Sequence, residues 1–152
     1  MNTNTPIRNT DTAALNDMIE VLNEGRNFYE EASAKVERED LKALFVRMAR
    51  IKQAIANDLR TAVVANDAIP AGGSFAGKLP TVYAEVRSKL SSNKDDEYVT
   101  QLEECEDRIM CAFKNAASTS DDQAVRKIAR RYMPEVMRDH NEMKTLNQVS
   151  VH

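Results

Sequence analysis

The sequence predicts an all-α fold: four long helices arranged as two antiparallel hairpins, joined by a long crossover that contains a short helix. Two observations favour this fold. The 152 residues include only four glycines and four prolines, whereas sandwiches and barrels need many turn residues. Apolar residues also recur at intervals of three and four over long stretches, which is the period of an amphipathic helix. The length corresponds to one domain with room for a single core.

The first hairpin is predicted from two long amphipathic stretches. One helix is expected over residues 12–36, with Thr10 or Asp11 as its N-terminal cap, and a second over 40–66. Only a short turn separates them, so the two helices should pack antiparallel. Residues 1–11 are polar and are expected to form a flexible N-terminus.

A long connection follows, and it contains most of the residues that break helices. Three of the four glycines and two of the four prolines lie between residues 70 and 80. A shorter apolar stripe then predicts a small helix over 80–90, with Pro80 in its first turn. A connection of roughly 25 residues can travel the length of a bundle, so the long helices before and after it should run parallel.

The second hairpin is predicted over residues 94–118 and 121–147. Its second helix opens with Ser120-x-x-Gln123, the pattern of a capping box. All the predicted helices together form one bundle domain over residues 12–148.

Composition excludes several classes of protein. The net charge is −3 and 30% of the residues are charged, which is typical of neither a basic nucleic-acid arm nor an acidic tail. No apolar run approaches the roughly 20 residues of a membrane span, and no secretory signal is visible. Cys105 and Cys111 are separated by about 9 Å of helical rise, too far for a disulfide. We expect a cytoplasmic protein, with Cys111 on the outer face of its helix.

Three groups of residues carry a resemblance to a known family. They are Leu15 to Gly25 with Phe28-Tyr29-Glu30-Glu31-Ala32, then Asp40 to Phe45 with Gly73 to Gly77, and Glu104-Cys105-Glu106-Asp107. Over roughly residues 12–147 the chain resembles a bacterial family of unknown function, domain-of-unknown-function family 2383, which has a ferritin-like bundle. The resemblance implies a ferritin-like four-helix bundle and carries over no biochemical activity.

A ferritin-like bundle raises the question of a carboxylate-bridged pair of iron or manganese ions. Such a site takes one Glu from each of two helices and a Glu-x-x-His motif from each of the other two. The second predicted helix contains no such motif, and the last offers only Glu135-x-x-Arg138. We therefore expect no cofactor. The alternative is a reduced set of ligands for iron or manganese: Glu106, Asp139 and His140.

The inward face of the bundle carries a different polar set. A helical wheel at about 100° per residue puts Gly25 at the centre of the first helix's inward face and turns its glutamates, Glu20 among them, outward. If the second and third long helices are parallel, Lys52 and Glu106 lie at nearly one height, and we predict that they pair. A lone buried charge would be costly. The expected buried polar cluster comprises Lys52, Glu106, Asp139, Tyr29 and Tyr132. The alternative is that Lys52 extends its ammonium group to the surface and no pair forms.

A short basic cluster lies on the last helix and comprises Arg126, Lys127, Arg130 and Arg131. Basic side chains can contact phosphates, but no aromatic residue interleaves these four, which disfavours nucleic acid as a partner. The interpretation that the residues favour is a non-catalytic ferritin-like bundle that acts through protein contacts, with a second copy or another protein as partner and no membrane. The alternatives are a metal-binding or redox bundle and a nucleic-acid-associated bundle.

Overall fold

The computed structural model describes residues 9–65, 82–92, 94–119 and 123–150, and these ranges form five helices with no strand. The helices are α1 (Asn9–Lys35), α2 (Glu39–Ala65), α3 (Val82–Lys89), α4 (Asp95–Thr119) and α5 (Gln123–Ser150). The predicted all-α class is confirmed for these ranges. Each observed helix overlaps one predicted helix, and the ends differ by up to three residues.

Two of the differences concern helix ends. Helix α1 begins at Asn9 rather than at residue 12, so Thr10 and Asp11 lie within the helix and are not its caps. Helix α5 continues to Ser150 rather than ending at residue 147. The predicted flexible N-terminus up to residue 8, the glycine-rich part of the crossover and the capping-box Ser120 lie outside the described residues.

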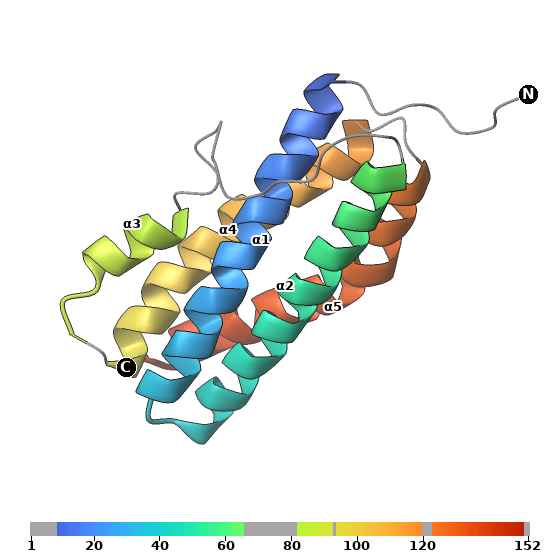
Figure 1. Ribbon diagram of the computed structural model, residues 1–152. Helices are drawn as coiled ribbons and strands as arrows, with labels where there is room; N and C mark the ends of the chain where they lie inside the picture. Colours follow the sequence, from blue (N-terminus) through green and yellow to red (C-terminus); the bar gives the residue numbers. More distant parts are fainter. Residues whose placement is uncertain (1–8, 66–81, 93, 120–122, 151–152) are drawn as a thin grey trace, which may run out of the picture.

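The four long helices pack as neighbouring pairs. Helix α1 packs against α2, and α4 packs against α5, while the contacts of α2 with α5 and of α1 with α4 join the two pairs. Figure 1 shows α2 and α4 running in one direction, with α1 and α5 running in the opposite one. The parallel direction of α2 and α4 is the one expected from the length of the crossover between them.

Two carboxylates organise the loops at one end of the bundle. Asp95, the first residue of α4, accepts hydrogen bonds from the backbone N–H groups of Glu37 and Arg38, both at 2.9 Å, and so joins α4 to the α1–α2 turn. Glu97 accepts hydrogen bonds from the backbone N–H and the hydroxyl of both Ser91 and Ser92. The hydrogen bonds from these two serines lower the pKa of Glu97 to about 2.

The short helix α3 lies against α1 and α4 (Figure 1). Its inner face buries Val82, Tyr83 and Val86. On its outer side, exposed ion pairs of 2.9 Å join it to α1 and to α4: Arg87 with Glu31, and Glu85 with Arg108. Helix α3 is thereby held so that Tyr83 points into the bundle, where it packs near the rings of Phe28 and Tyr29.

Candidate functional site

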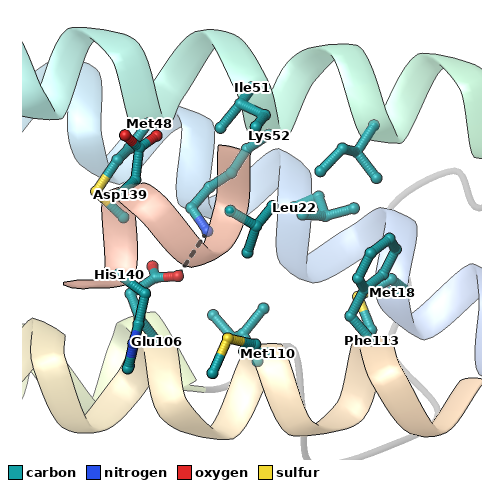
Figure 2. A pocket seen from close by; sticks show the side chains of 13 residues that line it. Met18, Leu22, Met48, Ile51, Lys52, Glu106, Met110, Phe113, Asp139 and His140 are labelled. Carbon is teal, nitrogen blue, oxygen red and sulfur yellow. Dashed lines mark hydrogen bonds and ion pairs between the residues drawn. The ribbon is translucent and has the colours of Figure 1, made fainter. Parts of the chain in front are cut away.

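A buried carboxylate, Glu106 of α4, binds three donors from three other helices. Its Oε1 accepts hydrogen bonds from the hydroxyls of Tyr29 on α1, at 2.7 Å, and of Tyr83 on α3, at 2.8 Å. Its Oε2 accepts a hydrogen bond from Lys52 Nζ on α2, at 2.9 Å. Figure 2 shows the lysine side chain reaching across the interior toward Glu106. We call Lys52, Glu106, Tyr29 and Tyr83 the central cluster.

The central cluster is electrically neutral and closed to solvent. The side chains of Lys52 and Glu106 are each only 6% exposed, so each charge depends on the other for compensation. The ammonium group of Lys52 also lies 5.6 Å and 5.9 Å from the ring centroids of Tyr29 and Tyr83, within the range of a cation–π contact. Burial, and after it the charge of Glu106, raises the pKa of both tyrosines well above the usual value. Both phenols therefore stay protonated and act as donors.

Gly25 makes the approach of two of these side chains possible. A Cβ atom at this position would lie 2.6 Å from the Tyr83 hydroxyl oxygen and 2.7 Å from Lys52 Cδ. Such distances are far below van der Waals contact. Gly25 was predicted to lie on the inward face of α1. The structure explains why a glycine occurs there: parts of Lys52 and Tyr83 fill the space that a side chain at this position would need.

A cavity of about 30 Å³ lies beside the central cluster and has mostly apolar walls. Lys52, Glu106, Asp139 and His140 are its polar lining residues (Figure 2). Asp139 is only 3% exposed, and its Oδ1 receives no hydrogen bond from any described residue. Arg47 Nε forms an ion pair with that oxygen at 3.9 Å. Burial raises the pKa of Asp139, and the positive charge of Arg47 opposes this only in part.

His140 is turned away from the carboxylates of the cavity. Its Nε2 lies 2.5 Å from Asp107 Oδ1, which is an ion-pair distance, although the ring is not aligned for a hydrogen bond. Asp107 is exposed on the outer face of α4. His140 therefore has its polar contact at the rim rather than at Glu106 or Asp139.

The structure brings together part of the cluster expected from the sequence. Lys52, Glu106 and Tyr29 meet, and Asp139 lines the cavity beside Lys52 and Glu106 without a hydrogen bond to any of the three. Tyr132 lies outside the cluster, contrary to expectation, because its hydroxyl donates to Asp58 Oδ2 at 2.6 Å. Tyr132 and Asp139 lie on the same face of α5, but seven residues separate them, which is about 10 Å along the helix axis. The two side chains therefore reach different heights in the bundle.

Sequence reasoning missed one member of the central cluster and misplaced another residue. Tyr83 takes the place that Tyr132 was expected to fill, and its only sequence signal was its position in the apolar stripe of the short helix. Glu20 was expected to point outward, but it is 6% exposed and therefore buried.

The alternative metal ligands do not form a suitable site. Glu106, Asp139 and His140 all line the cavity, yet among the residues that the structure describes no three His, Cys, Asp or Glu side chains converge closely enough to hold a metal ion. Both oxygens of Glu106 already accept hydrogen bonds from an ammonium group and two hydroxyls. A bound cation would have to displace these donors and lie close to the positive charge of Lys52.

The remaining candidates lie on the surface. Arg126, Lys127, Arg130 and Arg131 are exposed on α5. Cys111 is exposed, as expected, and Cys105 is buried. No helix in the described ranges combines the length and the apolar character required to cross a membrane.

Comparison with known proteins gives one result. No curated protein and no solved structure matches the chain. The model of a family described as a domain of unknown function (DUF2383) matches residues 11–119, a range that includes every residue of the central cluster. Because this match covers well over half of the sequence, the chain belongs to the DUF2383 family.

Proposed function

We propose that this chain is a non-catalytic, cytoplasmic protein with a ferritin-like bundle, which acts through protein contacts. In this proposal the central cluster takes the position at which a ferritin-like bundle would hold metal. The observation that supports the proposal is that both carboxylate oxygens of Glu106 already accept hydrogen bonds from the chain's own donors.

The helix arrangement supports the ferritin-like part of the proposal. Two hairpins pair side by side, and α2 and α4 run parallel on either side of a long crossover (Figure 1). Bundles with one long crossover connection have this topology, whereas plain up-and-down bundles have short loops throughout.

The chemistry of the cluster supports the absence of a catalytic metal. A carboxylate-bridged site needs several inward carboxylates that are available to cations. Here the inward position of α1 is Gly25, that of α2 is the cation Lys52, and that of α4 is the already bonded Glu106. Lys52 and Glu106 neutralise each other and join α2 to α4, which is a structural role.

Three methionines on α4 and α5, which we call the methionine seam, support the role in protein contacts. Met110 on α4 and Met133 on α5 are half-buried, and Met137 on α5 is 41% exposed, one of the few large apolar side chains in the described ranges with such exposure. Methionine side chains are flexible and polarisable and adapt to partner surfaces. The exposed thiol of Cys111 lies on α4 as well. We infer that this seam is where a second copy of the chain or another protein binds.

Two measurements test the proposal. The first is metal analysis of untagged protein produced in medium supplemented with iron and manganese, where we expect well below one ion per chain. Stoichiometric iron or manganese that is lost in Glu106→Ala would overturn the proposal in favour of the alternative ligand set of Glu106, Asp139 and His140.

The second measurement is the molar mass in solution, determined by light scattering over a range of concentrations. We expect association that Met137→Glu weakens. Val64→Glu is the matched control, because Val64 is also an exposed apolar residue, 56% exposed, but lies near the end of α2. A monomer at every concentration, or an equal effect of both substitutions, would contradict self-association through the seam.

A further inference from the structure

An open hollow with basic walls lies between α4 and α5, near the end of α4 and the start of α5. Its volume of about 360 Å³ is within the range of small-ligand sites, about 300–1,000 Å³. One lysine and two arginines line it, and no carboxylate of a described residue does. We call it the basic hollow, and its lining residues are Lys114, Ser118, Arg126, Ala129, Arg130 and Met133. The chain, whose net charge is −3, thus gathers three positive charges at one place on its surface.

Two cations of the basic hollow are not paired within the protein. Lys114 and Arg130 are exposed, and their side chains form no ion pair or hydrogen bond with any residue that the structure describes. Cations that line one hollow repel one another, and an anion bound between them relieves this repulsion. The basic hollow therefore favours a negatively charged ligand.

A second hollow, on the α2–α5 side, shows how this differs from an ordinary charged surface. Three arginines line it, but so do the carboxylates of Glu135 and Asp139. Arg138 forms an ion pair with Glu135, and Arg47 forms one with Asp139, both at 3.9 Å. The charges of the second hollow are thus largely compensated by the protein itself, whereas those of the basic hollow are not.

The helix register decides which basic residues of α5 take part. Arg126 and Arg130 are four residues apart, so they lie one above the other on a single face of α5. Lys127 and Arg131 each follow by one residue and point about 100° away, and neither lines the basic hollow. The guanidinium group of Arg131 lies instead over the ring of Tyr132, 5.4 Å from its centroid. The basic cluster noted in the sequence therefore divides into two pairs, and one pair lines the hollow.

The donors in the basic hollow suit a doubly charged anion. A guanidinium group can bind two oxygens of a phosphate at once, and a lysine adds a point charge. A phosphate monoester carries about −1.5 to −2 charge at pH 7 and has three acceptor oxygens, so it balances most of the three positive charges, whereas a carboxylate balances one.

The remaining walls suit a carbon substituent on the phosphate. Ala129 and Met133 are apolar, and the hydrocarbon stems of the lysine and the arginines add further apolar surface. Nucleic acid is a poorer match, because none of the six lining residues is aromatic and able to stack on a base.

We propose that the basic hollow binds a small organic phosphate ester, whose phosphate group is held by Lys114, Arg126 and Arg130 and whose carbon part contacts Met133. This site goes beyond the role in protein contacts. It shares Met133 with the methionine seam, but it depends on three cations that do not belong to the seam.

The test is a titration of the ¹⁵N-labelled protein with phenyl phosphate, followed by amide chemical shifts at constant ionic strength and about pH 7.5, where the ester is doubly charged. We expect saturable shifts at the backbone near Lys114 and Arg130. Inorganic phosphate should bind at least about fourfold more weakly, because it lacks an apolar contact worth one buried methylene group or more. Phenyl sulfate has the same shape and a single negative charge, and it should bind about fivefold more weakly.

Variants identify the site. Arg130→Gln and Lys114→Gln, on different helices, should each weaken phenyl phosphate binding about fivefold, because each removes one of the three cations. Lys127→Gln is the matched control: it removes the same charge from an exposed residue of α5 outside the hollow and should change the affinity less than about twofold. All three residues are exposed, so the variants should fold as the unsubstituted protein does.

Four results would overturn the proposal. The first is an absence of saturable shifts with phenyl phosphate, and if a short DNA duplex binds instead, the basic surface serves nucleic acid. The second is equal binding of inorganic phosphate and phenyl phosphate, which would exclude an ester as the preferred ligand. The third is equal binding of phenyl sulfate and phenyl phosphate, which would mean that the hollow accepts any anion. The fourth is an equal loss of affinity in Arg130→Gln and Lys127→Gln, which would show a general attraction to α5 and no defined site.

Discussion

The substitution Glu106→Gln tests whether the central cluster is the structural centre of this bundle. Glutamine keeps the size of the side chain but provides one acceptor oxygen and one NH₂ group. Three donors face this position: the Lys52 ammonium at 2.9 Å and the hydroxyls of Tyr29 and Tyr83 at 2.7 and 2.8 Å. In either orientation of the amide, the NH₂ group meets at least one of these donors, and the buried ammonium loses its counter-charge.

The expected cost follows from burial. Removing one partner of a buried ion pair costs about 3–5 kcal/mol, and the 6% exposure of both side chains places this pair in that class. For a chain of this length, each kcal/mol lowers Tm by about 2–4 °C. We therefore expect Tm to fall by roughly 6–20 °C.

The assay is urea unfolding followed by circular dichroism, with thermal melting as a second measurement. Glu104→Gln is the control, because this neighbouring glutamate is exposed and should change stability by no more than about 0.5 kcal/mol. Adding Lys52→Met to Glu106→Gln removes the uncompensated ammonium and should recover most of the loss. If Glu106→Gln and Glu104→Gln unfold within about 1 kcal/mol of each other, the ammonium group reaches solvent and our reasoning is refuted.

Three further perturbations have defined outcomes. Gly25→Ala should lower the free energy of unfolding by about 1–3 kcal/mol despite a gain of about 1 kcal/mol in helix propensity, and by less in a Tyr83→Phe background, as measured in urea. A net stabilisation by this alanine would contradict the close approach. Burial raises the pKa of Asp139, so the ionised carboxylate destabilises the folded protein. Asp139→Asn should therefore be more stable than the unsubstituted protein at pH 7, and it should lose this advantage below about pH 4, where the carboxyl group is protonated in both the folded and the unfolded state. A difference in unfolding free energy between the two proteins that stays constant with pH would contradict this prediction. A thiol reagent should modify Cys111 in the native protein and Cys105 only after unfolding, because burial raises the pKa of Cys105 and blocks access to its sulfur. Two reactive thiols in the folded protein would contradict this difference in reactivity.

The helices themselves were predictable because their cause is local. Apolar residues at intervals of three and four specify both the existence and the buried face of a long helix. The same pattern, with the parallel direction inferred from the crossover, placed Lys52 and Glu106 at one height. Helix ends were less predictable: Thr10 has a favourable cap chemistry, but α1 continues through it to Asn9. A cap residue terminates a helix only when the preceding residues leave the helical conformation.

The rest of the site depends on packing between elements distant in the sequence. The apolar stripe of α3 shows that Tyr83 is buried, but not where an eight-residue helix docks. Tyr132 shares a face with Asp139, and only the position along the bundle axis shows that its hydroxyl meets Asp58 instead. A helical wheel records angle and discards height, so it predicts which residues turn inward and not which of them meet.

The hydrogen bonds to Glu106 also have a consequence for how this molecule opens. One carboxylate is bonded to residues of α1, α2 and α3 while belonging to α4, so separating α2 from α4 leaves two buried charges unpaired, and separating α1 or α3 removes a hydroxyl donor from that carboxylate. Helix α5 contributes no residue to this arrangement, and the region matched by the family ends at residue 119, before α5 begins. The four joined helices should therefore protect their amide hydrogens as a single cooperative unit, while α5 can detach at lower free energy. Because Asp139 belongs to α5, such partial opening would also expose this buried carboxylate to water while the other four helices stay folded.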